Sequence, residues 1–383
     1  MDTNMVGAYG PWLDTLLAAN EPGLLSYRRP EFRDVAAWRA KARAKLLECL
    51  ALPDSGGTPR VEVVERNVVE GVEAEILRWQ LPYGPPTDAV FLKPAGATGP
   101  LPGIVALHDH GGMKYFGYRK IADDGRPLHP MLRRHRDEDY GGVAWANEVA
   151  KRGYAVLCHD TAPFASRRVR IADTPEAIHW NHAKDVSEDE TPEEINAYNQ
   201  WAGAHETIWA KSLGSAGSSW PALFLSDDMR AVEVLCARPE VDAARIGCAG
   251  LSGGGCRTVY LAGMDERIQV GICVGMMTTW RDYALYKAWT HTWMVWTPVV
   301  AKYLEYPEIM GLQLPKPMLV LSNNEDPLFT LTEMHRADAI LRAAYDKAGA
   351  SDRYLGKFYP GPHKFDPEMQ AEAWAWFDRW LKG

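Results

Sequence analysis

Long apolar runs are absent from this sequence of 383 residues. No stretch approaches the roughly 18 consecutive apolar residues that indicate a membrane-spanning helix, so we expect no membrane partner. The N-terminal segment MDTNMVGAYGPWLDTLLAANEPG has an early acidic residue and lacks a basic region followed by an apolar core, which does not fit a signal peptide. We therefore expect a cytoplasmic protein.

Clusters of like charge are also missing. The 42 Lys and Arg residues against 50 Asp and Glu residues give a net charge of −8, and these charges are dispersed along the chain. A nucleic-acid-binding protein usually carries a basic patch or stripe. We therefore expect no nucleic-acid partner.

Paired cysteines are lacking as well. The sequence contains no C-x-x-C pair, and each cysteine has apolar or small neighbours. This pattern predicts reduced, buried thiols and argues against a disulfide framework or a zinc site. The six cysteines are Cys49, Cys158, Cys236, Cys248, Cys256 and Cys273.

Strand-like and helix-like runs alternate through the middle and C-terminal parts of the chain. Several strand-like runs are continuously apolar, as is typical of strands buried on both faces. The alternation predicts an α/β fold with a mostly parallel central sheet and helices on both faces. The expected strands are 103–108, 154–159, 245–249, 268–274, 316–322 and 354–359, and the expected helices are 142–151, 223–236, 331–347 and 367–381.

The remaining segments differ from this pattern. Residues 32–52 contain good helix formers up to Pro53, so we assign 1–52 to an N-terminal helical extension and 53–383 to one main domain. Residues 60–93 hold β-rich runs that we expect to be antiparallel strands at one edge of the sheet. Two long insertions, about 163–221 and 276–315, follow expected strands. Such loops usually form caps or binding elements at the carboxyl edge of the sheet.

A G-x-S-x-G pattern occurs at residues 250–254, GLSGG. An expected strand precedes it and small residues follow, which is the context of a sharp turn that lifts a nucleophilic serine above a sheet. Ser252 is therefore our candidate nucleophile. The alternative is an ordinary Gly-rich turn between a strand and a helix.

A serine nucleophile needs a base, and that base needs a group to orient it. Asp326, in NNEDPLF, and His363, in GPHKF, each follow an expected strand and come after Ser252 in the chain order serine, acid, histidine. We predict a Ser252–His363–Asp326 triad. The alternatives within the sequence are Glu325 for the acid and His335 or His291 for the base.

Backbone donors for an oxyanion are expected at two places. One is Gly253, after the serine, and the other is the loop HDHGG after strand 103–108, where we select His110 and Gly111. The same loop allows an alternative, a metal site using His108 and His110. No further set of ligands supports that alternative, so we expect neither a metal nor another cofactor.

These motifs (LHDHGG, AGLSGGG, EDPLF and GPHKF) together resemble the dienelactone hydrolase-like and acetyl xylan esterase-like branch of the α/β-hydrolases. The resemblance covers roughly residues 95–383 and implies the α/β-hydrolase fold and esterase activity. Dienelactone hydrolases themselves use a cysteine nucleophile in a shorter chain, whereas this sequence has Ser252 and two insertions. The resemblance therefore implies a serine esterase rather than a dienelactone hydrolase.

Residues of the two insertions are candidates for substrate binding. Surface or loop-anchoring ion pairs with the acidic tract SEDETPEE, residues 187–194, are the favoured interpretation of Arg167 and Arg168. Because arginines can clamp a carboxylate, the alternative hypothesis is that Arg167 or Arg168 faces the pocket and favours an anionic or uronate-like substrate. In the second insertion Trp280 and Arg281 are the candidates.

The insertions also hold eight of the 15 tryptophans. Core packing of the cap is the favoured role for each of them, although as a group they would form an aromatic cap over Ser252 that suits sugars or aromatic acyl groups. The helical spacing of three of them favours packing in a helix. The eight are Trp180, Trp201, Trp209, Trp220, Trp280, Trp289, Trp293 and Trp296.

These observations predict a serine hydrolase that cleaves a carboxylic ester through an acyl-enzyme. The expected partner is a small-molecule ester, for example a sugar, uronate or aromatic ester, and formation of a homo-oligomer is left open. A serine peptidase of the same fold is the alternative within enzymes. A non-catalytic binding protein of the same fold is the alternative from another class.

Overall fold

The computed structural model describes residues 4–180, 183–185, 187 and 190–383. Within these residues the strands form one sheet in the order β1-β2-β3-β5-β4-β6-β7-β8-β9. The strands are β1 (Glu62–Val69), β2 (Val72–Trp79), β3 (Thr87–Pro94), β4 (Leu101–Leu107), β5 (Ala155–His159), β6 (Val241–Leu251), β7 (Ile268–Val274), β8 (Met318–Asn323) and β9 (Tyr354–Tyr359).

The pairing of the strands confirms the predicted fold class. β5, β4, β6, β7, β8 and β9 pair in parallel, whereas β1, β2 and β3 add to β5 as antiparallel strands at one edge. The β-rich residues 60–93 therefore form the antiparallel edge that the sequence predicted.

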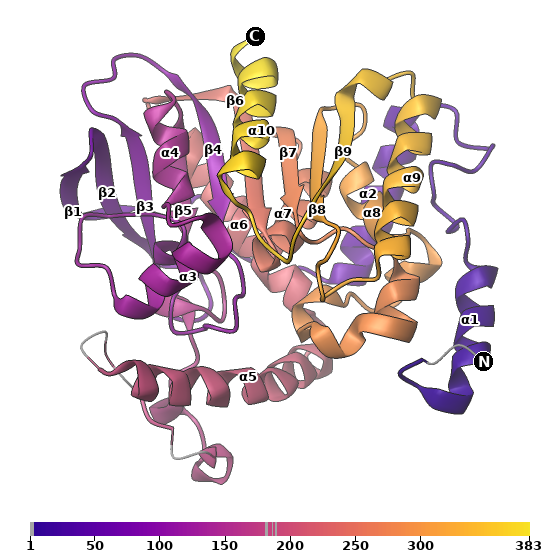
Figure 1. The fold of residues 1–383 in the computed structure, drawn as a ribbon, viewed down its shortest axis with the longest axis horizontal. Helices are drawn as coiled ribbons and strands as arrows, with labels where there is room; N and C mark the ends of the chain where they lie inside the picture. Colours follow the sequence, from indigo (N-terminus) through magenta and orange to yellow (C-terminus); the bar gives the residue numbers. More distant parts are fainter. Residues whose placement is uncertain (1–3, 181–182, 186, 188–189) are drawn as a thin grey trace.

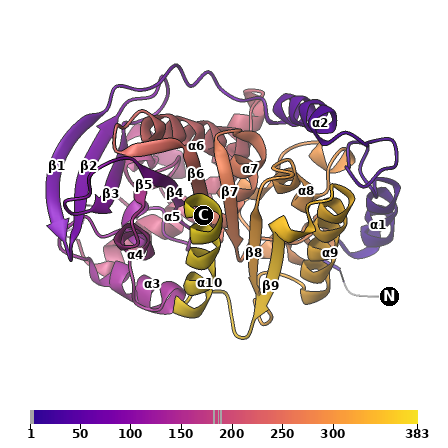
Figure 2. The ribbon, with the colours of Figure 1, turned by 90° about the horizontal axis from the view of Figure 1, so that it is seen from above.

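Helices cover both faces of the sheet (Figure 2), with α6 and α7 on one side and α4 and α10 on the other. Side chains of β5 show how the strands serve both layers: Leu157 points into one buried cluster and Val156 into the other. The helices are α1 (Gly10–Ala19), α2 (Val35–Leu50), α3 (Pro130–Tyr140), α4 (Trp145–Lys151), α5 (Pro192–Ser215), α6 (Trp220–Cys236), α7 (Gly253–Met264), α8 (Tyr306–Gly311), α9 (Leu331–Lys347) and α10 (Pro367–Phe377).

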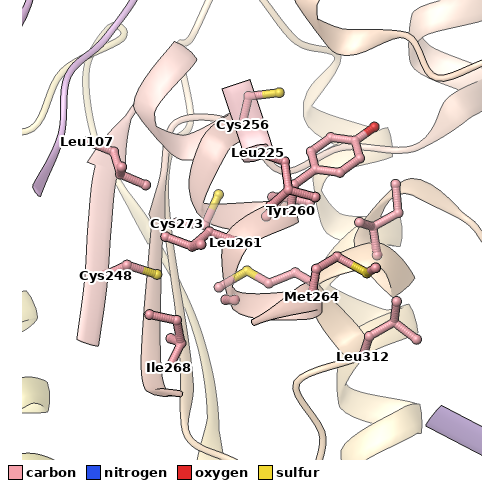
Figure 3. Packing of buried hydrophobic residues seen from close by; sticks show 14 of the residues in the cluster. Leu107, Leu225, Cys248, Cys256, Tyr260, Leu261, Met264, Ile268, Cys273 and Leu312 are labelled. Carbon is pink, nitrogen blue, oxygen red and sulfur yellow. The ribbon is translucent and has the colours of Figure 1, made fainter. Parts of the chain in front are cut away.

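Helix α7 is anchored on the sheet by apolar packing. Figure 3 shows Cys256, Tyr260 and Leu261 of α7 among side chains of the neighbouring strands, including Cys248 and Cys273. All five residues are fully buried. Because this packing fixes the first turn of α7, it also fixes the residue that precedes the helix.

Both insertions lie at the edge of the sheet where the parallel strands end (Figure 1). The first contains α5, which crosses below the sheet in that view, and the second contains short helical turns and α8. Helix α5 was not predicted, although the sequence TPEE carries its start signal: Thr191 and Glu194 form a capping box around Pro192.

The N-terminal helix α2 belongs to the main core through Trp38 and Leu46. No helix in the described part of the chain is long and apolar enough to cross a membrane.

Candidate active site

Ser252 occupies a sharp turn between β6 and α7. Its backbone has φ 57° and ψ −119°, a conformation that residues other than glycine rarely adopt. Its amide donates a hydrogen bond to the carbonyl of Val274 on β7 (2.9 Å). A side chain on Gly254 would collide with the carbonyl of Leu107 on β4, so the glycine is needed for the close approach of α7 to the sheet. The local geometry is that of a nucleophile elbow.

Asp326 and His363 are in direct contact. Nδ1 of His363 lies 2.6 Å from Oδ2 of Asp326, which is almost completely buried (4% exposed). The other carboxylate oxygen of Asp326 accepts a hydrogen bond from the amide of Leu328 (2.9 Å), so the side chain is held on both sides. Glu325, the alternative acid, is exposed to solvent.

The two alternative histidines have other partners than Asp326. The ring of His335 packs on Phe358 with ring centres 4.2 Å apart. His291 contacts the carbonyl of Leu328 through Nε2 (3.0 Å) and lines the same pocket as His363. Burial lowers the pKa of His291 to about 4. Its imidazole is therefore neutral at physiological pH and forms part of the wall of that pocket.

One pocket of about 460 Å³ contains both Ser252 and His363. The Nε2 atom of His363 is buried and makes no hydrogen bond to any atom of the described residues, which leaves it available to a proton donor in the pocket. The apolar part of the lining is Leu251, Met276, Met294, Val295 and Leu328.

Gly253, His110 and Gly111 line the same pocket. The backbones of Gly253 and His110 touch, because a Cβ on Gly253 would lie only 2.7 Å from the amide nitrogen of His110. Gly111 has φ +51°, which glycine adopts without strain. Gly253 is the first residue of α7, so its amide has no partner within the helix. The backbones of these three residues therefore lie at the pocket that contains Ser252.

Residues 218–383 match the model of the prolyl oligopeptidase family. The protein named "Putative hydrolase YtaP" of Bacillus subtilis (strain 168) is 25% identical over 351 residues, which are 90% of this chain and 100% of that protein.

Solved structures give the fold. A crystal structure named as a putative acetyl xylan esterase from Bacteroides fragilis NCTC 9343 superposes with a TM-score of 0.67 at 16% identity, covering 91% of this chain and 82% of that one. A glucuronoyl esterase from Solibacter usitatus gives a TM-score of 0.64 at 16% identity, covering 93% and 97%. The protein has the α/β-hydrolase fold. The fold that the resemblance implied is therefore confirmed.

The loop that carries His110 is held by buried charges. Oδ1 of Asp109 accepts from Nε2 of His135 (3.0 Å) and from the hydroxyl of Tyr140 (2.5 Å). Nζ of Lys120 lies 3.5 Å from the other oxygen of Asp109. Burial alone would raise the pKa of Asp109, but His135 and Lys120 hold it well below its usual range.

The ring of His110 is fixed on its other side by α5. Its Nδ1 accepts from the amide of Gly112 (3.0 Å), so Nε2 carries the proton that is donated to Oε1 of Glu206 (2.6 Å). Lys114 forms an ion pair with the same Glu206 oxygen. Burial and the charge of Lys114 lower the pKa of His110. The first insertion, through Glu206 of α5, thus holds the loop that carries His110.

The arginines that were candidates for substrate binding face other parts of the molecule. Arg167 is buried and pairs with Asp227 (3.3 Å), and it also donates to the carbonyl of Tyr83. Arg168 stacks on the rings of Tyr115 and Tyr198. Neither is among the residues that line the Ser252 pocket, so the hypothesis that Arg167 or Arg168 faces this pocket is wrong.

Ion pairing of these arginines with the acidic tract, residues 187–194, stays a prediction. Residues 188 and 189 of the acidic tract lie outside the described residues. Arg167 takes its carboxylate partner from α6 instead, because Asp227 is on that helix.

The candidates in the second insertion are structural as well. Trp280 is buried, and its indole N–H donates to the carbonyl of Leu304 (3.0 Å). Arg281 pairs with Asp14 of α1 and approaches Glu333 of α9. Neither residue lines the pocket of Ser252. Arg281 ties the N-terminal extension to the rest of the molecule.

The tryptophans of the insertions do not cap Ser252. None of the eight belongs to the described lining of its pocket. Trp289 and Trp293 are 76% and 46% exposed, and short 3-10 turns replace the expected helix. Packing within a helix is therefore wrong for these two residues. A separate apolar pocket of about 380 Å³ is lined by Trp220, Trp280, Trp293 and Trp296.

Several residues of the site were not predicted. Lys120, His135 and Tyr140 lie in a segment without a recognisable motif, so nothing in the sequence pointed to them. Gly275 directly follows β7 and contacts the His363 ring. Its position after a buried strand is a signal that could have identified it. Among the described residues no group of three or more His, Cys, Asp or Glu side chains is placed to hold a metal ion.

Proposed function

We propose that this protein is a serine hydrolase that cleaves carboxylic esters through an acyl-enzyme. The observation that carries the proposal is that the strained elbow of Ser252 shares one pocket with a His363 imidazole bound to Asp326. The names of the relatives, a hydrolase and two esterases, support the same class of reaction. The proposal requires no cofactor.

In this reaction Ser252 Oγ attacks the ester carbonyl carbon while Nε2 of His363 takes the hydroxyl proton. The carbonyl oxygen becomes an oxyanion that accepts hydrogen bonds from the amides of Gly253 and the His110–Gly111 loop. The bond to the alcohol then breaks, and His363 returns the proton to the departing alcohol oxygen. Water, deprotonated by His363, attacks the acyl-enzyme and restores Ser252. Asp326 orients the imidazole and stabilises its positive charge.

The pocket favours esters with an uncharged acyl group. The described residues that line it include no Lys or Arg, whereas Asp139 contributes a carboxylate. His135 pairs with this carboxylate (2.8 Å), so no cation of the described lining is left to pair with an anionic acyl group. The apolar wall around Met276, Met294 and Leu328 fits a small to medium acyl chain. Acetyl esters and glucuronoyl esters, for which the structural relatives are named, are the first classes to test.

A serine peptidase is the second candidate function. It is favoured by one observation, the match of residues 218–383 to the prolyl oligopeptidase model. The triad would be the same and only the leaving group would differ. We further propose that the protein works in the cytoplasm, which is supported by its six free cysteines.

The test combines labelling with turnover. A fluorophosphonate probe should label the wild-type protein but not S252A, and p-nitrophenyl acetate should be hydrolysed only by the wild type. A panel of acetylated sugars, glucuronoyl esters, aromatic esters and peptides then separates the two enzyme classes, since a peptidase would prefer the amides. A folded protein that is neither labelled nor active contradicts the proposal and favours a binding protein of the same fold.

A further inference from the structure

Lys120 is a fully buried cation behind the oxyanion loop (0% exposed). Its Nζ donates hydrogen bonds to two successive backbone carbonyls, those of Asp109 (2.9 Å) and His110 (2.8 Å). A charged side chain that donates hydrogen bonds to two carbonyls of one loop fixes the orientation of that loop.

The identity of the two carbonyls is informative. The carbonyl of Asp109 and the amide of His110 belong to one peptide unit, and the carbonyl of His110 and the amide of Gly111 belong to the next. In a trans peptide the C=O and N–H bonds point in opposite directions within one plane. By drawing both oxygens toward itself, Lys120 turns both N–H groups away from itself.

We propose that Lys120 is a positioning residue of the oxyanion hole, which aims the N–H groups of His110 and Gly111 at the developing oxyanion. This inference rests on the proposed ester hydrolysis. It goes further by assigning a role to a residue that does not itself line the pocket. A cation on a carbonyl also polarises its peptide unit, which makes the attached N–H a stronger donor.

The surroundings keep this ammonium in place. The backbone carbonyl of Lys120 accepts a hydrogen bond from the guanidinium of Arg136 on α3 (3.2 Å). The Nζ of Lys120 lies 5.1 Å from the centre of the Phe164 ring. Asp109 and Asp139 are the nearby carboxylates, and Lys114 and His135 are the nearby cations. Burial lowers the pKa of Lys120, whereas the Asp109 carboxylate opposes that shift.

The opposite end of the parallel strands offers a matched control. Nζ of Lys316 also donates to two backbone carbonyls, those of Glu266 (2.6 Å) and Ile268 (2.9 Å), just before β8 begins. The variants K120Q and K316Q therefore remove the same kind of contact, one behind the oxyanion loop and one away from the pocket.

The experiment measures kcat and KM on p-nitrophenyl acetate, with enzyme concentrations set by fluorophosphonate titration. For K120Q we expect kcat to fall by about 10²-fold, the effect of losing one oxyanion donor, and KM to change by less than about threefold. The inhibition constant of an alkyl boronic acid, which forms a tetrahedral adduct on the serine, should rise by at least about 10-fold. K316Q should leave all three quantities near the wild-type values.

Each outcome decides the question. A folded K120Q with wild-type kcat and boronic acid inhibition overturns the inference, and so does an equal effect of K316Q. If K120Q does not fold, K120R replaces it. Arginine keeps the charge but is longer and planar, so kcat should fall at least about threefold at constant KM, and an unchanged kcat overturns the inference. An inactive wild-type protein would instead contradict the proposed ester hydrolysis itself.

Discussion

Gly275 lies directly against the imidazole of His363. A Cβ built on Gly275 would stand 2.9 Å from Cε1 and 3.2 Å from Nδ1 of that ring. The glycine has φ +57°, and its amide donates to the carbonyl of Leu321 on β8 (2.9 Å), so its backbone is fixed by the sheet. Gly275, at the carboxyl end of β7, therefore packs against the imidazole and limits its movement on that side.

The first prediction concerns this contact. In G275A the added methyl group must push the imidazole away from its present position, and a displacement of about 1 Å can cost about 10²-fold in rate. We expect kcat on p-nitrophenyl acetate to fall by about 10- to 100-fold. Steady-state kinetics and thermal unfolding of the same samples provide the measurement.

A matched control separates displacement of the ring from backbone strain. Gly349 also has a positive φ, +67°, but a Cβ there would meet no atom within 4 Å. G349A should lose about 1 kcal/mol of stability or somewhat more and keep its activity. Equal loss of activity in G275A and G349A would show that the contact with His363 is not the cause.

The sequence could predict the positions of Ser252, Asp326 and His363 relative to the sheet because each follows a short run that is recognisable as a strand. Parallel strands bring their carboxyl ends to one edge, so local pattern is enough to gather such residues there. The nine-stranded sheet with its antiparallel edge followed from the same pattern.

Residues joined only by tertiary packing could not be found in this way. Lys120 and His135 reach Asp109 from different segments, and neither has a neighbouring motif. The substrate-binding role of Arg167 and Arg168 could not be judged from the sequence, because an arginine in a loop near a strand end can pair with many different groups. Arg167 pairs with Asp227 on α6. The spacing of Trp289 and Trp293 suggested a helix, but the chain turns there in short 3-10 segments that leave both indoles exposed.

The second prediction tests the triad acid. D326N should lower kcat by about 10⁴-fold, because the amide no longer stabilises the imidazolium or holds the correct tautomer of His363. E325Q is the control at the adjacent, exposed position and should stay within about twofold of the wild type. Rates at saturating p-nitrophenyl acetate are the measurement. A large loss in E325Q together with an active D326N would reverse the assignment.

The third prediction concerns the arginines of the first insertion. R168A should leave the ratio of rates on acidic and neutral aryl esters unchanged, since Arg168 stacks on Tyr115 and Tyr198 and does not line the Ser252 pocket. R167A should lower the free energy of unfolding by about 3 kcal/mol, because it leaves the buried carboxylate of Asp227 without its cation. Urea unfolding and a paired-substrate assay measure the two effects. A selective loss of activity on acidic esters in R168A would contradict the placement.

The last prediction follows from His135, which is clamped between two carboxylates. Its Nε2 contacts Asp109 (3.0 Å) and its Nδ1 contacts Asp139 (2.8 Å). Burial alone would lower its pKa, but the charge of Asp109 and the hydrogen bonds to both carboxylates raise the pKa of His135 to about 9. The native protein therefore holds this proton more tightly than the unfolded chain, where histidine titrates near 6.5. This contribution to stability is complete below about pH 6.5 and is lost as the pH rises through about 9.

H135Q removes that titration. We expect the difference in free energy of unfolding between the wild type and H135Q to be largest at pH 6 and to shrink steadily toward pH 10, as measured by urea unfolding at several pH values. Y140F is the control because it removes another hydrogen bond to Asp109, and the pKa of the Tyr140 hydroxyl is well above its usual value, chiefly through burial. Its cost, about 1 kcal/mol, should be the same at every pH in this range. A pH-independent cost for H135Q would mean that His135 is neutral in the native protein, and that the carboxylates of Asp109 and Asp139 are balanced by Lys120 alone.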